Sequence, residues 1–595
     1  MSENRVMRIL SPVFLLAFAG AALGAVTSVD HIAGKVHFAV DPKLPANRII
    51  ADIALAPRNA EGLVEFSADV DIIKPKDSNG TALVEISNRG GKGLLATFDS
   101  DFLLGHGFTL VWVGWEFDIP AGEKLLHLYA PVATDHGKTI VGLVRSEWEG
   151  DKRVTTIPLG DRNQIGYAVA DPNYAENRLL VRDTVNGERR TIARDKWTFS
   201  DATHVAMADG FEPGKIYEVI YQAKDPVVAG LGLAAIRDMV SFLKHDQQYH
   251  IERALGFGIS QSGRFLREFL YDGFNQDEKN QRVFDGVWAA VAGAGRGSFN
   301  ERFAQPSRDG HPFYNVFYPV DIPPFTDNYG ALAPKIFYTN GSYEYWGRAA
   351  SLIHTTEDGQ RDAPIAKDTR IYFFAGAQHG SGSIPPREVE AQNPAGVNDY
   401  RAGMRALLVA MQAWLKDGKE PPPSQYPRIA KDQLVALGAL AFPKIPGVQV
   451  PQRKREAYRL NFSVEPPKVG PPFPTLIPQV DQDGNETSGI KMPEIAVPLA
   501  SYTGWNLRSR AIGAPEEMYT FTGSWIPFPL NKAEREKRKD PRPSIEERYR
   551  DQNDYLERIT AAARKLVEQG FLLDPDVPKL RERAAKEWDY VLRSN

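Results

Sequence analysis

The residues best suited to chemistry lie in the run Gly-Ile-Ser-Gln-Ser-Gly-Arg at positions 258–264. An apolar stretch ends at this run and an amphipathic stretch follows directly, which predicts a strand, a sharp turn and a helix. A serine on such a turn is held in a strained, exposed position beside a helix N-terminus. Gly258 and Ser262 lie two residues before and after Ser260, where small side chains let the strand and helix approach closely. Ser260 is therefore the candidate nucleophile, and replacement of Ser262 by glycine should be tolerated.

A serine nucleophile needs a histidine base and a carboxylate that orients this base. On folds with such a turn the order along the chain is serine, acid, histidine. The histidines after Ser260 are His311, His354 and His379. His379 is the predicted base, because it follows an apolar strand in the loop Gly-Ala-Gln-His-Gly-Ser-Gly. The acid should follow the preceding strand, and Glu344 lies just past the end of that strand.

The oxyanion of an acyl-transfer intermediate needs two backbone N–H donors. The amide of Gln261, directly after the candidate nucleophile, is the first expected donor. The second is expected from Gly90 or Gly91, in the loop Asn-Arg-Gly-Gly that follows the compact apolar strand at 82–86.

The elements that must position these residues alternate between strands and helices, which predicts an α/β fold with a mostly parallel, doubly wound sheet. Sites in such sheets lie at the carboxyl ends of the strands. We expect a catalytic domain over 30–416 that starts with a β-meander and contains a β-rich insertion at 118–215. A proline-rich segment at 417–595 should wrap over the core and end in packed helices. One of these should start at Ser544, with Glu547 completing a capping box, and stop at Gly570.

Aromatic residues are frequent in the irregular stretch 295–333, which lies where hydrolases place a lid. We expect this lid-like loop and the residues after Glu344 to form an apolar substrate pocket. The expected pocket residues are Phe299, Phe303, Phe313, Tyr314, Phe317, Tyr345 and Trp346.

Two further motifs are interpreted as structural. Gly-Leu-Gly-Leu-Ala-Ala at 230–235 imitates a dinucleotide fingerprint, but the next strand ends in Ser260 and not in the acidic residue that binds a ribose. Asp-Gln-Asp-Gly-Asn at 481–485 imitates a calcium loop without the later bidentate glutamate, so it is interpreted as a turn. The sequence thus predicts neither a cofactor nor a metal.

Composition limits the other possibilities. The chain has 595 residues, a net charge of −4 and no cysteine. The charge gives no reason to expect a nucleic-acid partner, and the missing cysteines exclude disulfides and thiolate chemistry. Residues 1–24 have a short basic start, an apolar stretch and a small-residue cleavage site, which predicts a signal peptide and an exported protein, periplasmic or secreted. No later segment is long and apolar enough to span a membrane.

The chain resembles a large bacterial family of α/β-hydrolase-domain proteins, the serine esterases of that fold. The resemblance is carried by the runs Ala-Pro-Arg-Asn at 56–59, Ser-Asn-Arg-Gly-Gly-Lys-Gly at 87–93, the serine turn at 258–264, Glu-Tyr-Trp-Gly-Arg at 344–348 and Val-Asp-Gln-Asp-Gly-Asn-Glu at 480–486. It implies an α/β-hydrolase fold and esterase-type activity. The aromatic residues of 295–333 lead us to expect a small ester with an apolar or aromatic part as the substrate. An amidase, lactonase or acyltransferase would use the same three residues, and a catalytically silent binding protein of this fold stays an alternative.

Overall fold

The fold is known from a computed structural model, which describes residues 9–10, 29–120, 122, 124–161, 164–185, 187–308, 315–317, 332–461 and 468–594. The predicted signal peptide therefore lies outside the described residues, except for Ile9 and Leu10, which pair with the next strand.

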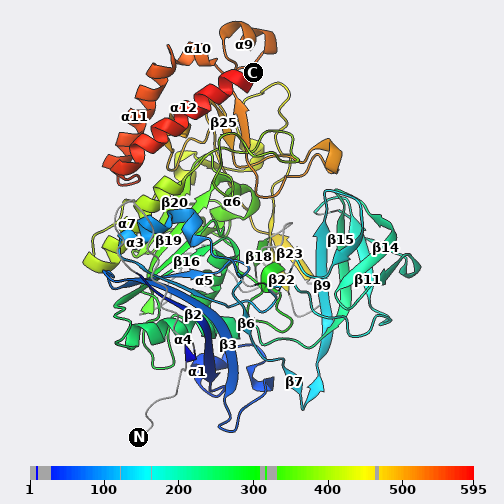
Figure 1. The fold of residues 1–595 in the computed structure, drawn as a ribbon. Helices are drawn as coiled ribbons and strands as arrows, with labels where there is room; N and C mark the ends of the chain where they lie inside the picture. Colours follow the sequence, from blue (N-terminus) through cyan, green and yellow to red (C-terminus); the bar gives the residue numbers. More distant parts are fainter. Residues whose placement is uncertain are drawn as a thin grey trace.

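One large mixed sheet forms the centre of the molecule (Figure 1), with the strand order β1-β2-β3-β5-β4-β16-β17-β19-β20 and β6 paired to β3. Its strands are β1 (Ile9–Leu10), β2 (Val29–Val40), β3 (Val64–Pro75), β4 (Thr81–Ile86), β5 (Thr109–Val113), β6 (Leu128–Tyr129), β16 (Arg253–Ile259), β17 (Gly286–Ala290), β19 (Lys335–Gly341) and β20 (Thr369–Phe374). The run from β5 through β4 to β20 is parallel, whereas the N-terminal strands pair antiparallel. The predicted meander and mostly parallel sheet are thus joined in one sheet.

The long helices that flank this sheet include α4 (Leu231–His245), α5 (Gln261–Tyr271) and α7 (Arg401–Asp417), with the short helices α1 (Pro45–Arg48), α2 (Leu94–Phe98), α3 (Ser100–Gly105) and α6 (Ser342–Gly347). Side chains alternate between the two faces of a strand, so the contacts of neighbouring residues in β16 show which helix packs on each face of the sheet. Gly256 faces α5, because a Cβ at this position would lie 3.2 Å from Leu266. Phe257 points the other way and packs edge-to-face on Phe98 of α2. Helices therefore cover both faces of the parallel strands.

The β-rich insertion stands beside the main sheet, at the right in Figure 1. It consists of β9 (Val141–Glu149), β11 (Arg178–Arg182), β12 (Arg190–Ile192) and β15 (Ile216–Lys224) in one sheet, and β10 (Val154–Pro158), β13 (Trp197–Phe199) and β14 (His204–Phe211) in another. The insertion was expected to end at 215, but β15 pairs with β9 and β11 and so belongs to it. The dinucleotide interpretation of 230–235 fails for the same reason, because the strand before that motif is not in the parallel sheet.

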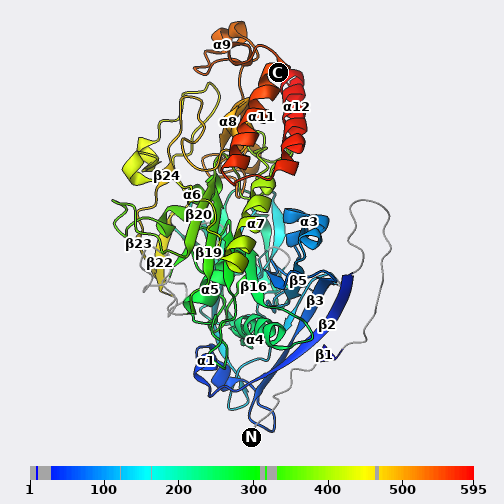
Figure 2. The same ribbon diagram turned by 90° about the vertical axis from the view of Figure 1, so that its left-hand side faces the viewer.

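The chain after α7 crosses over the carboxyl ends of the parallel strands and finishes in helices at the top of the molecule (Figures 1 and 2). Its helices are α8 (Pro493–Ala496), α9 (Lys532–Arg538), α10 (Ile545–Arg548), α11 (Gln552–Glu568) and α12 (Val577–Ser594). The remaining short strands are β7 (Thr134–Asp135), β8 (Lys138–Thr139), β18 (Asn315–Phe317), β21 (Leu434–Val435), β22 (Ala457–Asn461), β23 (Lys468–Pro472), β24 (Ile477–Pro478), β25 (Ala500–Thr503) and β26 (Ser524–Pro527). Gln425 and Ile490 each pair with β20, which would otherwise be the exposed edge of the sheet.

The helix predicted from Ser544 to Gly570 is two helices. The capping box is present, since the amide of Ser544 donates to Glu547 Oε2 at 2.9 Å. The helix that it starts ends at Arg548, and Asp551 caps the next helix by accepting from the amide of Asp554 at 2.8 Å. A strong N-cap residue such as Asp551 signals the start of a new helix, even within a stretch whose apolar residues follow one helical pattern. The apolar pattern by itself did not show this break.

Candidate active site

Ser260 occupies a strained turn between β16 and α5. Its φ is 61° and its ψ is −114°, a backbone conformation that residues other than glycine rarely adopt. The amide of Ser260 donates to the carbonyl of Ala290 at 2.8 Å, which ties the turn to β17. A Cβ on Gly258 would lie 2.4 Å from the carbonyl oxygen of Ser262, so the turn closes only with glycine there. The strand, turn and helix predicted from the sequence are present.

Ser260, His379 and Glu344 are joined by two hydrogen bonds. The Ser260 hydroxyl lies 2.9 Å from Nε2 of His379, and Nδ1 of His379 lies 2.6 Å from Oε1 of Glu344. Glu344 follows β19 in α6, and His379 follows β20. Because β16, β19 and β20 run parallel, their carboxyl ends bring the three side chains to one edge of the sheet.

Glu344 is fully buried and both of its carboxylate oxygens have a partner. Oε2 accepts the backbone amide of Gly341 at 2.7 Å, while Oε1 faces His379. Burial lowers the pKa of His379 below its ordinary value, and the hydrogen bond from Glu344 opposes this shift. The charges of Arg348 and Arg264 also lower the pKa of His379. The environment therefore favours neutral imidazole, the form that can accept a proton.

Phe521 of the C-terminal segment covers His379, and the sequence did not predict this. The ring of Phe521 stacks on the imidazole with centroids 4.4 Å apart and an angle of 27°. The amide of His379 donates to the carbonyl of Phe521 at 3.3 Å, and the Tyr400 hydroxyl donates to the carbonyl of His379 at 2.9 Å. The contacts with Phe521 cross a long stretch of chain, so no local pattern around His379 signals them.

The amides expected to hold the oxyanion differ in whether they already donate to a carbonyl oxygen of the protein. Gln261 is the first residue of α5, and amides in the first turn of a helix have no carbonyl partner within the helix. The prediction is wrong for Gly91, because its amide donates to the carbonyl of Asn88 at 3.0 Å and closes a tight turn. Gly90, at the tip of this turn, stays a prediction. The Asn88 side chain donates to the carbonyl of Ile259 at 2.8 Å and so fastens the turn beside the serine.

Buried polar groups surround the Gln261 side chain. Its Nε2 donates to Oε1 of Glu116 and to the carbonyl of Pro306, the latter at 2.6 Å. Nearby, Asp118 accepts the amide of Ser307 at 3.1 Å, and burial raises the pKa of Asp118 to about 6. These contacts attach the beginning of the predicted lid-like stretch to the first turn of α5.

The aromatic residues expected in the substrate pocket have packing roles where the structure describes them. Phe299 packs edge-to-face on Trp115, and Phe303 on Tyr167 of the insertion. The Tyr345 hydroxyl is 2.9 Å from Nε2 of His354. The four buried rings are those of Phe299, Phe303, Tyr345 and Trp346. These four rings pack against neighbouring side chains, and their place in the substrate pocket stays a prediction.

Three other expected pocket positions cannot be placed. Phe313 and Tyr314 lie outside the described residues, and only the backbone of Phe317, in β18, is described.

The turn at 481–485 has protein partners for both carboxylates. Asp481 Oδ1 accepts the amides of Asp483 and Asn485 at 2.9 and 3.0 Å. Asp483 forms a bidentate ion pair with Arg548, at 2.8 and 2.5 Å. Among the described residues no group of three or more histidine, aspartate or glutamate side chains is arranged to hold a metal ion.

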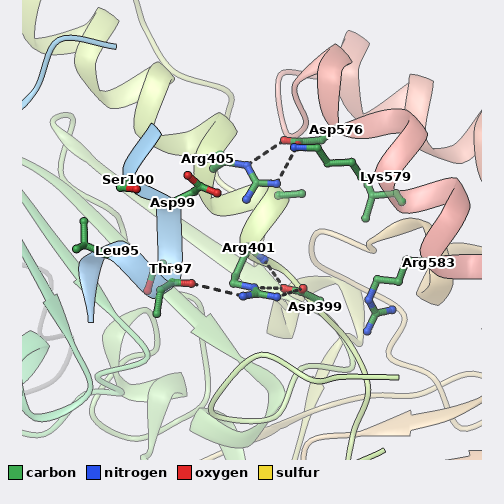
Figure 3. Close-up of a pocket in the computed structure, with 13 residues that line it drawn as sticks. Leu95, Thr97, Asp99, Ser100, Asp399, Arg401, Arg405, Asp576, Lys579 and Arg583 are labelled. Carbon is green, nitrogen blue, oxygen red and sulfur yellow. Dashed lines mark hydrogen bonds and ion pairs between the residues drawn. The ribbon is translucent and has the colours of Figure 1, made fainter. Parts of the chain in front are cut away.

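A cavity of about 510 Å³ lies between α2, α3, α7 and α12 (Figure 3). Two ion pairs are part of its charged lining. Arg401 binds Asp399 at 2.6 Å, and Arg405 binds Asp576 at 2.7 Å. This cavity does not include Ser260, His379 or Glu344.

A family of proteins described as "Alpha/beta hydrolase domain" has a model that matches residues 165–582, well over half of the chain and all three residues joined above. The chain belongs to this α/β-hydrolase family. The hydrolase has no match among curated proteins. None of its described helices is long and apolar enough to cross a membrane.

Two solved structures are similar to this hydrolase at a low level. One is described as LpqC, poly(3-hydroxybutyrate) depolymerase from Bordetella parapertussis, with 11% identity, a TM-score of 0.22, and 65% of this chain and 90% of the other covered. The other is described as a novel bacterial esterase, with 9% identity, a TM-score of 0.21, and 55% and 78% covered. At these TM-scores neither likeness bears on the residues of the site.

Proposed function

We propose that this hydrolase cleaves a carboxylic ester through an acyl-enzyme, with Ser260 as nucleophile, His379 as general base and acid, and Glu344 as the residue that orients His379. The observation that carries the proposal is the continuous chain of hydrogen bonds from Ser260 Oγ through the imidazole to Glu344, at 2.9 and 2.6 Å. A serine alcohol is a weak nucleophile until such a base removes its proton.

In the first half of the proposed reaction, Ser260 Oγ forms a bond to the ester carbonyl carbon as its proton passes to His379 Nε2. The buried carboxylate of Glu344 stabilises the resulting imidazolium through Nδ1. The amide of Gln261 donates to the developing oxyanion. The intermediate then breaks the bond to the alkoxy oxygen, which takes the proton from Nε2 and leaves as an alcohol. Water attacks the acyl-enzyme by the same steps in the second half, and the carboxylic acid and free Ser260 are regenerated.

The proposed substrate is a small ester with an apolar or aromatic part. The partly exposed ring of Phe521 lies against the imidazole, with centroids 4.4 Å apart, and provides apolar surface next to the proposed base. A panel of p-nitrophenyl esters of graded acyl length would show which chain the site prefers. Matched anilides and lactones, with product analysis, distinguish the ester hydrolase from an amidase or a lactonase, and added alcohols reveal acyl transfer.

The test of the nucleophile compares two serines in one turn. Ser260→Ala should lower kcat/KM by about 10³-fold or more and abolish labelling by a fluorophosphonate probe, because both need the same oxygen. Ser262→Ala is the matched control, and its activity should stay near that of the wild type. A Ser260→Ala protein with full activity, or a wild-type protein that the probe does not label, would overturn the proposal and favour a silent binding protein.

We also propose that the protein is exported and that residues 1–24 are removed. N-terminal sequencing of the protein from culture medium or periplasm should find Ala25 first, because Ala-Leu-Gly at 22–24 is a small-residue cleavage site. Recovery of the uncleaved chain in the cytoplasm alone would contradict this.

A further inference from the structure

A strand-like piece of the C-terminal segment reaches the edge of the sheet from which His379 projects. Ile490 pairs parallel with Phe374, and its amide donates to the carbonyl of Phe373 at 2.7 Å. The amide of Ala375 in turn donates to the carbonyl of Ile490 at 3.1 Å. This pairing places the residues just before Ile490 next to the start of the loop that carries His379.

Glu486, in this piece, contacts both loops of the site. It is 3% exposed, and its Oε2 accepts a hydrogen bond from the Ser342 hydroxyl at 2.7 Å and another from the amide of Gly376. Ser342 lies two residues before Glu344, and Gly376 lies three residues before His379. One buried carboxylate oxygen therefore joins the first turn of α6, which follows the β19 end and carries the proposed acid, to the loop of the proposed base.

The turn that holds Glu486 is itself fixed from several sides. Asp481 folds the turn through two backbone amides, and Arg548 holds Asp483. The Asn485 side chain accepts the amide of Tyr502 at 2.8 Å and donates to the carbonyl of Ala500 at 3.1 Å. A side chain on so well anchored a turn can help to determine the position of the segments that it contacts.

We infer that Glu486 is a positioning residue for the proposed ester hydrolysis: by holding Ser342 and Gly376 together, it fixes the distance between Glu344 and His379. The inference rests on the proposed function. The amide of Tyr343 also donates to the carbonyl of Ala377, at 3.2 Å, so Glu486 strengthens an existing backbone contact between the two loops. A displacement of about 1 Å at a catalytic hydrogen bond can lower the rate about 100-fold.

The geometry supplies a conservative replacement. Both hydrogen bonds end on one oxygen, so the carbonyl oxygen of a glutamine could accept both. Burial raises the pKa of Glu486 to about 7, toward the neutral form that a glutamine imitates. Glu486→Gln should therefore keep the loops in place, whereas Glu486→Ala removes both contacts.

The experiment compares Glu486→Ala, Glu486→Gln and Arg548→Ala in the full-length protein, by kcat, KM and the pH profile of kcat/KM for a p-nitrophenyl ester. Arg548→Ala is the matched control, since it removes an outer anchor of the same turn while the contacts of Asp481 and Asn485, which adjoin Glu486, remain. We expect a 10- to 100-fold lower kcat with little change in KM for Glu486→Ala, and values within about threefold of wild type for the other two.

The pH profile separates positioning from a general structural role. His379 faces Glu344, Arg348 and Arg264, and only the Glu344 contact raises its pKa. A loosened contact in Glu486→Ala should therefore move the acidic limb of kcat/KM to lower pH, with Glu486→Gln and Arg548→Ala unchanged. If Glu486→Ala does not fold, Ser342→Ala, which removes one of the two bonds, should shift the same limb in the same direction.

The inference fails if Glu486→Ala keeps the wild-type kcat and acidic limb. It also fails if Arg548→Ala loses as much activity as Glu486→Ala. If only Ser342→Ala folds, the inference fails when that variant matches the wild type. In each case the wild-type protein still hydrolyses the ester and is labelled at Ser260. Loss of the proposed function itself would instead appear as a wild-type protein that the fluorophosphonate probe does not label.

Discussion

At the residue scale, the site depends on a backbone conformation as much as on side chains. Ser260 is held at a positive φ between a strand and a helix, and Gly258 is the residue that lets the turn close. The strain is retained because the main chain of Ser260 is also bonded to β17 through Ala290.

Gly258→Ala should disrupt this turn. The new Cβ would lie 2.4 Å from the Ser262 carbonyl oxygen and 2.8 Å from the amide nitrogen of Gly263, both backbone atoms that must shift. We expect a loss of about 1–3 kcal/mol in the free energy of unfolding and loss of probe labelling at Ser260. Gly105→Ala is the control, because nothing lies within 4 Å of a Cβ there. It should leave the free energy of unfolding and the probe labelling unchanged. Normal labelling of Gly258→Ala would contradict the close approach.

Glu344→Gln should change both the rate and its pH dependence. The substitution removes the carboxylate charge that raises the pKa of His379, so this pKa should fall further below its ordinary value. Because the base must be neutral to accept a proton, the acidic limb of kcat/KM should move to lower pH while kcat falls by about 10²–10⁴-fold. Steady-state kinetics across pH 4–8 would measure both. The exposed Glu357, changed to glutamine, is the control, and an active Glu344→Gln with an unshifted limb would assign the acid role to another residue.

At the element scale, the last helix is attached to the hydrolase core through a partly buried ion pair. Arg405 of α7 donates to Asp576, directly before α12, from Nη2 at 2.7 Å and from Nε at 3.2 Å. These residues form one wall of the charged cavity in Figure 3. The charges of this wall are matched by neighbours, so its evident role is to join α7 to α12.

Arg405→Ala should weaken this attachment. It leaves the buried carboxylate of Asp576 with only Lys579, whose nitrogen is 4.0 Å away. We expect about 1–3 kcal/mol of lost stability in urea unfolding, because a buried carboxylate loses its main partner. Lys579→Ala is the matched control, since its side chain is 76% exposed and such pairs contribute little. Equal losses in the two variants would contradict the assignment.

At the scale of the whole molecule, a buried carboxyl group joins the last helix to strands β25 and β26 within the C-terminal segment. Glu587 of α12 accepts the Tyr502 hydroxyl at 2.6 Å and the indole N–H of Trp525 at 3.0 Å, both on Oε1. Burial raises the pKa of Glu587 to about 7. The folded protein therefore binds a proton between about pH 4.5 and 7 that the unfolded chain releases.

It follows that stability should fall as pH rises through this window, since the free energy of unfolding decreases wherever the folded state binds more protons. Glu587→Gln can keep both hydrogen bonds without titrating, so its decline from pH 5 to 8 should be shallower than that of the wild type by on the order of 1–3 kcal/mol. Urea unfolding at each pH would measure this difference. Glu582→Gln, on the exposed side of the same helix, should keep the wild-type slope, and an equal slope in Glu587→Gln would refute the raised pKa.

The sequence by itself determined the order and spacing of the proposed catalytic residues. Ser260, Glu344 and His379 each follow an apolar strand, and parallel strands bring their carboxyl ends together, so local patterns were enough to place all three at one edge. The tight turn at Gly258 and the capping box at Ser544 were also predictable, because each depends on residues only a few positions apart in the sequence.

Only the tertiary structure decided what surrounds these residues. The sequence pattern could not show that β15 belongs to the insertion or that the rings of Phe299 and Tyr345 are packed in the core. Nor could it show that the amide of Gly91 donates to a carbonyl within a tight turn. Phe521 and Glu486 contact the site from positions more than 100 residues after His379 and Glu344, respectively. Contacts of this kind depend on the path of the chain across the sheet, and that path is set by the packing of the whole molecule and not by any local periodicity.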